Sequence, residues 1–247
     1  MRNIALGKVS VLHKTCARHT ALIRLAQTML PCDVVVIASE QRSGTTELAA
    51  DLSHRANALN LGEYFNPWGG QVALPKHCAQ KARLTMTARA AAPLETVMRT
   101  RDACGYKRAL VRIFTLQGAG TLTSPNKTHT QLLAGPTCVI ILERNVTDRF
   151  CSLQRVVKTK NWFETRDWHP SCPGINLNTP NARGFFNKHT RWFSTIRRLV
   201  RSVYPMQPVV ELQFADLESR AISNNRLSKR NATLDALVAW MSPSYAH

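Results

Sequence analysis

The stretch Asp33-Val-Val-Val-Ile-Ala-Ser-Glu-Gln-Arg-Ser-Gly-Thr-Thr-Glu-Leu48 decides the fold. It begins with Val34–Ala38, a continuous and largely β-branched apolar run that is typical of a buried strand in a parallel sheet. A polar turn containing Gly44 follows, and Thr45–Asn57 is expected to be a helix. Strand, tight turn and helix in this order open a βαβ unit. Ligands bind at the carboxyl ends of strands in open α/β sheets, so the turn is a candidate site.

The same alternation continues along the chain. Strands are expected at Tyr106–Phe114, Val139–Leu142 and Val209–Phe214, and helices at about Thr147–Lys160 and at Asn187–Val203. This order predicts an α/β fold with three layers and a mostly parallel central sheet. Residues 66–82 and 164–186 are rich in Pro, Gly, Asn and Trp, so we expect them to be long functional loops.

Length and composition limit the class of protein. The chain has 247 residues, of which 44% are hydrophobic, so it has enough apolar residues for one substantial domain. Its aliphatic runs are far shorter than the roughly 20 residues of a membrane span. We therefore expect a soluble protein, cytoplasmic or organellar. Lys and Arg exceed Asp and Glu by 33 to 15, a net charge of +18, which favours an anionic partner such as nucleic acid, an acidic glycan, an acidic lipid or a phosphorylated ligand.

The N-terminal segment and the cysteines give little information about function. Residues 1–32 hold five Lys or Arg and no acid, and they are expected to be either a packed helix or a transit-like presequence. The seven cysteines form no CxxC pair, which argues against a zinc ribbon, and we expect no metal. Their odd number favours reduced thiols, although one or two disulfides are compatible with it.

The turn after the first strand has the chemistry of an anion site. A helix N-terminus offers unpaired N–H groups and the positive end of the helix dipole. Gly44 allows a close backbone approach, and Arg42 adds a charged fork beside the three hydroxyl residues Ser43, Thr45 and Thr46. The turn lacks the GxxxxGK[ST] pattern, which disfavours a nucleoside triphosphatase. The alternative is a plain helix cap at Ser43 or Thr45.

A second strand followed by a helix occurs at residues 138–162. The strand ends at a basic residue, Arg144, and Ser152 lies eight residues on, about two helical turns into the next helix. Arg144 and Ser152 are therefore expected to converge on one phosphate beside the first loop.

Together the two segments resemble the sulfotransferase superfamily, whose sulfuryl donor is 3′-phosphoadenosine 5′-phosphosulfate (PAPS). Gln41-Arg-Ser-Gly-Thr-Thr is similar to the 5′-phosphosulfate loop, in the form of the carbohydrate and glycolipid enzymes. Leu142-Glu-Arg-Asn-Val-Thr-Asp-Arg-Phe-Cys-Ser is similar to the 3′-phosphate motif, with Val146 in place of the usual Pro. Phe214-Ala-Asp-Leu resembles a late Tyr-Glu-Asp-Leu segment.

The resemblance implies a single domain over residues 33–247, with a P-loop-like phosphosulfate loop on a fold shared by sulfotransferases and nucleotide kinases. It implies PAPS as cofactor, with 3′-phosphoadenosine 5′-phosphate (PAP) as product. Arg42 would stabilise charge on the departing 5′-phosphate. The remaining cofactor contacts would come from Ser43, Gly44, Thr45 and Thr46 at the 5′ end and from Arg144 and Ser152 at the 3′-phosphate. A last contact is expected from Lys229 and Arg230 in a basic loop, whose alternative is a solvated loop.

Leu61-Gly-Glu-Tyr-Phe-Asn-Pro resembles the segment that supplies the base in carbohydrate-type enzymes, which makes Glu63 the candidate. The helix Thr45–Asn57 carries the chain about 20 Å from the loop, and an extended return of about 20 Å is just long enough. We therefore expect a short strand at Ala58–Gly62 that ends with Glu63 beside the loop, where a carboxylate can accept a hydroxyl proton. The alternative is a surface Glu63.

The acceptor is expected to be a hydroxyl group on a carbohydrate or glycolipid. No His follows Tyr106–Phe114, which argues against the aryl-type mechanism. Residues that could contact the acceptor or lie near it are Lys107, Arg112, Trp162, Trp168 and His169, with His54 and His77 more typical of the surface.

Two other functions stay open. A basic protein that binds nucleic acid or another polyanion is disfavoured, because no nucleic-acid motif is present and the basic residues are dispersed. A catalytically degenerate relative that still binds a nucleotide is the other alternative, although Arg42, Gly44, Arg144 and Ser152 are all present.

Overall fold

A computed structural model describes residues 32–66, 74–79, 86–114, 127–133, 137–160, 174–203, 207–217 and 224–241, without the side chains of 79, 86–88, 127, 203 and 224–227. The expectation for residues 1–32 therefore lies outside the described residues except at Cys32. So do the expectations for Trp162, Trp168 and His169.

The described strands form one parallel sheet of five strands in the order β2-β3-β1-β4-β5. Their bounds are β1 Val34–Ser39, β2 Leu59–Asn60, β3 Ala109–Phe114, β4 Cys138–Glu143 and β5 Val209–Gln213. Strand β1 lies between β3 and β4, and every residue of β1 and β3 is buried. This explains why these strands read as continuous apolar runs rather than as alternating ones.

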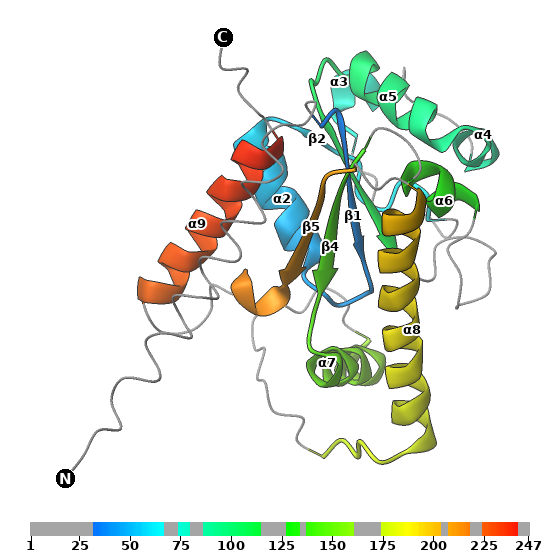
Figure 1. The fold of residues 1–247 in the computed structure, drawn as a ribbon, viewed down its shortest axis with the longest axis vertical. Coiled ribbons are helices and arrows are strands. Elements are labelled where there is room, and N and C mark those ends of the chain that lie inside the picture. The colour runs from blue at the N-terminus through cyan, green and yellow to red at the C-terminus, as the bar shows by residue number, and fades with distance from the viewer. Residues whose placement is uncertain are drawn as a thin grey trace.

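Helices cover both faces of the sheet, as Figure 1 shows. One face carries α2 (Thr45–Ala56) and α9 (Asn224–Met241), and the other carries α5 (Pro93–Ala103), α6 (Lys127–Leu133) and α8 (Pro180–Val203). Helix α7 (Val146–Thr159) lies below the carboxyl ends of the strands and packs on α8. The short elements are α3 (Lys76–Ala79), α4 (Met86–Ala91) and the 3-10 turn η2 (Phe214–Asp216).

Two hydrophobic cores lie on the two faces of the sheet. Alternate residues of β1 point to opposite sides, so Val35 and Ile37 pack in the core with α2 and α9, while Val36 packs in the core with α8. In the α8 core, Trp192 is 1% exposed and its indole nitrogen donates to the Ser39 carbonyl at 3.1 Å. The predicted three-layer α/β fold with a parallel sheet is confirmed.

Several boundaries differ from the sequence-based prediction. Strand β3 begins at Ala109 rather than at Tyr106. Helix α8 begins at Pro180, inside the expected loop 164–186, because Thr179 Oγ1 accepts from the Ala182 N–H at 3.1 Å and proline suits the first helical position. The expected basic loop at Leu227–Asn231 lies within helix α9.

Disulfide bonds correct the preference for reduced thiols. Cys32 is bonded to Cys138 and Cys78 to Cys104, and Cys151 is disulfide-bonded as well. The first disulfide joins the amino ends of β1 and β4, with its Cα atoms 5.5 Å apart. Among the described helices, none is both long and apolar enough to cross a membrane.

Replacing both Cys32 and Cys138 by Ser should lower the free energy of unfolding by several kcal/mol. This disulfide joins residues 106 apart, whereas Cys78–Cys104 joins residues 26 apart. The longer loop restricts the unfolded chain more, so its removal should cost about 1 kcal/mol more than the matched Cys78→Ser, Cys104→Ser pair. Denaturant unfolding of the two double variants measures this, and an equal or smaller loss at Cys32 and Cys138 contradicts it.

Candidate functional site

The loop between β1 and α2 has an unusual backbone. Arg42 has φ of 65° and Gly44 has φ of 79°, so both residues are left-handed. Gly44 is the N-cap of α2 and forms no side-chain capping hydrogen bond. A helix start of this kind presents backbone N–H groups to a ligand, and anions bind there most readily.

Ser43 lies at the centre of this loop. It is 0% exposed, and within the described residues its hydroxyl has no hydrogen-bond partner. A buried polar group in that state costs about 1–3 kcal/mol, which a hydrogen bond to a bound oxygen would offset. The helix N-terminus and this hydroxyl therefore both point to a ligand with anionic oxygens.

The predicted 3′-phosphate site, at Arg144 and Ser152, lies in contact with the β1–α2 loop. Arg144 follows β4, is 6% exposed, and donates from Nη1 to the Arg42 carbonyl at 2.8 Å. Arg42 in turn donates from Nε to the Ser152 hydroxyl of α7 at 3.1 Å. These contacts bring together residues up to 110 positions apart in the sequence.

Positive charge is concentrated at this junction. Burial lowers the pKa of Arg42, and the charge of nearby Arg155 on α7 lowers it further. Two guanidinium groups that repel each other in a half-buried place favour the binding of an anion between or beside them.

Phe214 packs against Gly44 in the β1–α2 loop and against Arg144, which follows β4. Its ring lies where a side chain on Gly44 would be, and the Arg144 guanidinium sits 4.7 Å from the ring centroid. A small hollow beside this contact is lined by Gly44 and Phe214 together with Asp51 and Arg230. In the sequence Phe214 stands out only as part of a late motif, and no local pattern indicates that it lies next to Gly44.

Glu63 lies at the carboxyl end of the short strand β2. Hydrogen bonds continue the pairing with β3 beyond Asn60, from the Leu61 N–H to the Leu110 carbonyl and from the Arg112 N–H to the Gly62 carbonyl, both at 2.9 Å. The strand expected at Ala58–Gly62 is therefore shorter than predicted, since β2 covers only Leu59–Asn60, but its pairing with β3 continues to Gly62, which has a left-handed φ of 58°. Glu63 is half-buried and accepts from the Asn66 side-chain amide at 2.7 Å.

Arg112 connects Glu63 to the first loop. It is 3% exposed, and its Nη1 donates to the Thr46 hydroxyl in the first turn of α2. Burial lowers the pKa of Arg112, and the charge of nearby Glu63 opposes that shift. Glu63, Arg112 and Thr46 thus form one group at the carboxyl edge of the sheet.

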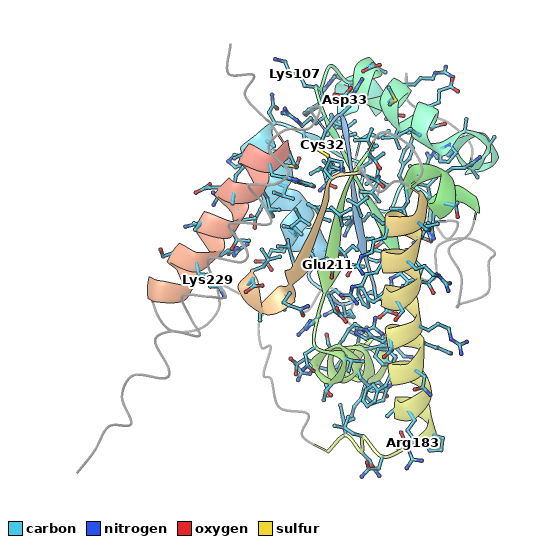
Figure 2. All side chains as sticks on the ribbon, viewed as in Figure 1. Cys32, Asp33, Lys107, Arg183, Glu211 and Lys229 are labelled. Carbon is cyan, nitrogen blue, oxygen red and sulfur yellow. A yellow bond between two sulfur atoms is a disulfide. The ribbon has the colours of Figure 1, made fainter. Side chains whose placement is uncertain are left out.

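Other predicted residues lie elsewhere or have protein partners. Lys107 lies at the amino edge of the sheet with Cys32 and Asp33, as Figure 2 shows, so the expectation that it faces the acceptor is wrong. The Lys229 ammonium pairs with Asp216 at 2.8 Å, and Arg230 pairs with Glu47 at 2.9 Å and with Asp51. His54 and His77 are exposed, as expected.

Three further residues, which no sequence pattern singled out, lie next to the β1–α2 and β4–α7 loops. Glu40 follows β1, Glu143 ends β4, and both carboxylates contact the ring of His189 from α8. The available signal was a charged residue at the end of each buried strand. The histidine itself gave no signal, because a lone His on an amphipathic helix is common.

Comparisons with known proteins identify no family for this chain. No family model matches the sequence, and no curated protein matches it. Among solved structures, a sugar kinase from Janibacter sp. HTCC2649 has a TM-score of 0.40 and 16% identity, over 88% of this chain and 99% of that chain. Shikimate kinase from Bacteroides thetaiotaomicron has a TM-score of 0.35 and 9% identity, over 83% and 97%. Both TM-scores are below 0.5, so these two structures are only distantly similar to this chain.

Gly44→Ala should destabilise the protein and weaken binding at the loop. The new methyl group would collide with the Phe214 ring and would also force a left-handed conformation on a residue with a side chain. We expect a loss of about 1–3 kcal/mol in unfolding free energy. The matched variant is Gly105→Ala, at φ of 75° with open space around it, which carries only the backbone strain. A loss at Gly44 no larger than at Gly105 contradicts the close contact.

Proposed function

We propose that this chain is a sulfotransferase that moves the sulfuryl group of PAPS to a hydroxyl group of a carbohydrate or glycolipid. The observation that carries the proposal is the contact of Arg42 with Ser152, together with that of Arg144 with the Arg42 backbone. These residues belong to the two stretches that resemble the 5′-phosphosulfate loop and the 3′-phosphate motif. A nucleotide with phosphate groups at both its 3′ and 5′ positions needs two such binding sites next to each other.

In this proposal the loop and the start of α2 bind the 5′ end of the nucleotide. The hydroxyl groups of Ser43, Thr45 and Thr46 and the backbone at Gly44 donate to phosphosulfate oxygens. Arg42 stabilises the charge that grows on the departing phosphate. Its present partner Ser152 belongs to the other phosphate site, so both residues are within reach of the ligand.

Arg144 and Ser152 bind the 3′-phosphate in this proposal. A buried arginine binds phosphate through two parallel hydrogen bonds, which separates a nucleotide that has a 3′-phosphate from one that lacks it. Lys229 and Arg230 stay predicted contacts, and each would have to exchange a carboxylate partner for the ligand.

Glu63 acts as the general base. It takes the proton of the acceptor hydroxyl while the acceptor oxygen forms a bond to sulfur and the bond from sulfur to the bridging phosphate oxygen breaks, which leaves PAP. Arg112, between Glu63 and Thr46, orients this group relative to the first loop. Asn66 holds one Glu63 oxygen at 2.7 Å and leaves the other for the acceptor.

The disulfides favour an oxidising compartment over the cytoplasm for this activity. All five cysteines in the described part of the chain are disulfide-bonded, and thiols of cytosolic proteins are normally kept reduced. This revises the expectation of a cytoplasmic protein and leaves the organellar one.

PAP binding tests the nucleotide site. In calorimetric titrations we expect wild type to bind PAP at least tenfold more tightly than AMP or ATP, because only PAP has both phosphates. Ser152→Ala and Arg144→Lys should each weaken PAP binding about tenfold or more, since each removes a charge-assisted hydrogen bond. Arg99→Ala, at an exposed position on α5, is the matched control and should bind as wild type does.

Equal, weak and salt-sensitive binding of all three nucleotides would instead support a polyanion-binding protein. Selective PAP binding without transfer to any glycan acceptor would support the degenerate relative.

Glu63→Gln should lower kcat for sulfuryl transfer by about 10²- to 10⁴-fold and leave PAP affinity unchanged, because the amide cannot accept the hydroxyl proton. Transfer of labelled sulfate from PAPS to a panel of glycans and glycolipids measures this. The exposed Glu95→Gln on α5 is the control. A Glu63→Gln variant with unchanged kcat would show that another group is the base.

A further inference from the structure

One histidine contacts a carboxylate next to each of the two predicted phosphate-binding loops, the β1–α2 loop and the β4–α7 loop. Glu40 is the first residue after β1, directly before the first loop, and Glu143 is the last residue of β4, directly before Arg144. His189 of α8 contacts both carboxylates. Its Nδ1 lies 2.7 Å from Glu40 Oε2, and its Nε2 lies 3.2 Å from Glu143 Oε1. His189 is 5% exposed and Glu40 is 3% exposed, so water does not screen the first contact.

Only a protonated ring could donate hydrogen bonds to both carboxylates. An ionised carboxylate can only accept hydrogen bonds, and a neutral imidazole has one N–H donor and one lone pair. Because both ring nitrogens of His189 face carboxylate oxygens, only the imidazolium form donates to Glu40 and Glu143 at once. In the neutral form one lone pair would face a carboxylate, and one of the two contacts would be lost.

The neighbouring charges come from each element packed around the ring. Arg149 of α7 pairs with the same Glu40 oxygen, and Arg197 of α8 pairs with the second Glu143 oxygen at 2.6 Å and with Glu211 of β5 at 2.8 Å. Burial lowers the pKa of Arg149 to about 9, so that group still carries its charge at neutral pH.

The remaining neighbours are uncharged or neutral. The Phe193 ring lies 4.8 Å from the His189 ring, between ring centroids. His129 of α6 packs on Trp192 rather than on His189, and burial lowers its pKa to about 4, which keeps it neutral. The hydrogen bond from His189 is the main reason that the pKa of Glu143 falls to about 2, ahead of the contact with Arg197.

We propose that His189 is a positioning residue that holds the two phosphate loops in register through Glu40 and Glu143, and that the proton on its ring is part of the nucleotide-binding state. The inference rests on the proposed function, since it needs a ligand that spans both loops. When the ring loses its proton, one of its two hydrogen bonds, to Glu40 or to Glu143, is lost. The carboxylate next to that phosphate-binding loop then also lacks a neighbouring positive charge. Both effects weaken the binding of a doubly phosphorylated nucleotide as the pH rises.

The experiment compares PAP affinity by calorimetry from pH 5.5 to 9 in wild type, His189→Gln and the exposed control His54→Gln. The ratio of wild-type to variant affinity removes the titration of PAP itself. We expect wild type to bind PAP about tenfold more tightly than His189→Gln at pH 6, from the loss of one charge-assisted contact, and the two to differ less than twofold at pH 9. His54→Gln should follow wild type throughout.

A ratio that stays constant across this pH range would mean that His189 is only structural and would overturn the inference, as would equal affinities at pH 6. A wild type that binds no PAP at any pH would overturn the proposed function and this inference with it. If His189→Gln does not fold, nitrogen NMR of the wild-type histidines decides: two protonated ring nitrogens at His189 at pH 6 support the proposal, and one overturns it.

Discussion

The parallel pairing of β1 with β4 is the constraint on which the rest of the site depends. Their register, with Val35 opposite Cys138 and Ala38 opposite Ile141, ends both strands at the same edge of the sheet. Each strand then continues directly into a loop and a helix start, so the two loops are neighbours although the chain between them is long. The contacts among Arg42, Arg144 and Ser152 follow from this arrangement, and a different strand order would separate them.

The strands and the first helix could be predicted because burial on both faces leaves a continuous apolar run with clear ends. The positions of Val34–Ser39 and Cys138–Glu143 follow from that property, and these two strands are predicted to within one residue at either end. Helix ends are harder to predict. The start of α8 was missed although Thr179 and Pro180 form a good helix start, because the surrounding Pro and Asn residues suggested a loop. The loop expected around Lys229 and Arg230 rests on the family resemblance alone, and the structure places both residues in α9 instead.

The candidate site was only partly predictable, for a different reason. Residues beside a strand end, such as Ser43 or Arg144, are placed by local pattern. The tie from His189 to Glu40 spans 149 positions and arises only when α8 packs across the sheet. Likewise a net charge of +18 indicates an anionic partner but does not reveal that Arg149, Arg197 and Arg112 are occupied by internal partners. Side chains that come together only through packing have no recognisable spacing pattern in the sequence.

The disulfide between Cys32 and Cys138 also affects how the chain folds. The central pairing of β1 with β4 is long-range in the reduced chain, and closing such a large loop slows folding. Once the bond has formed, Val35 and Val139 begin close together even in the unfolded chain, so this pairing becomes in effect a local contact. The oxidised chain therefore has a lower effective contact order than its sequence suggests, and the β1–β4 pair becomes the natural nucleus on which β3 and β5 assemble.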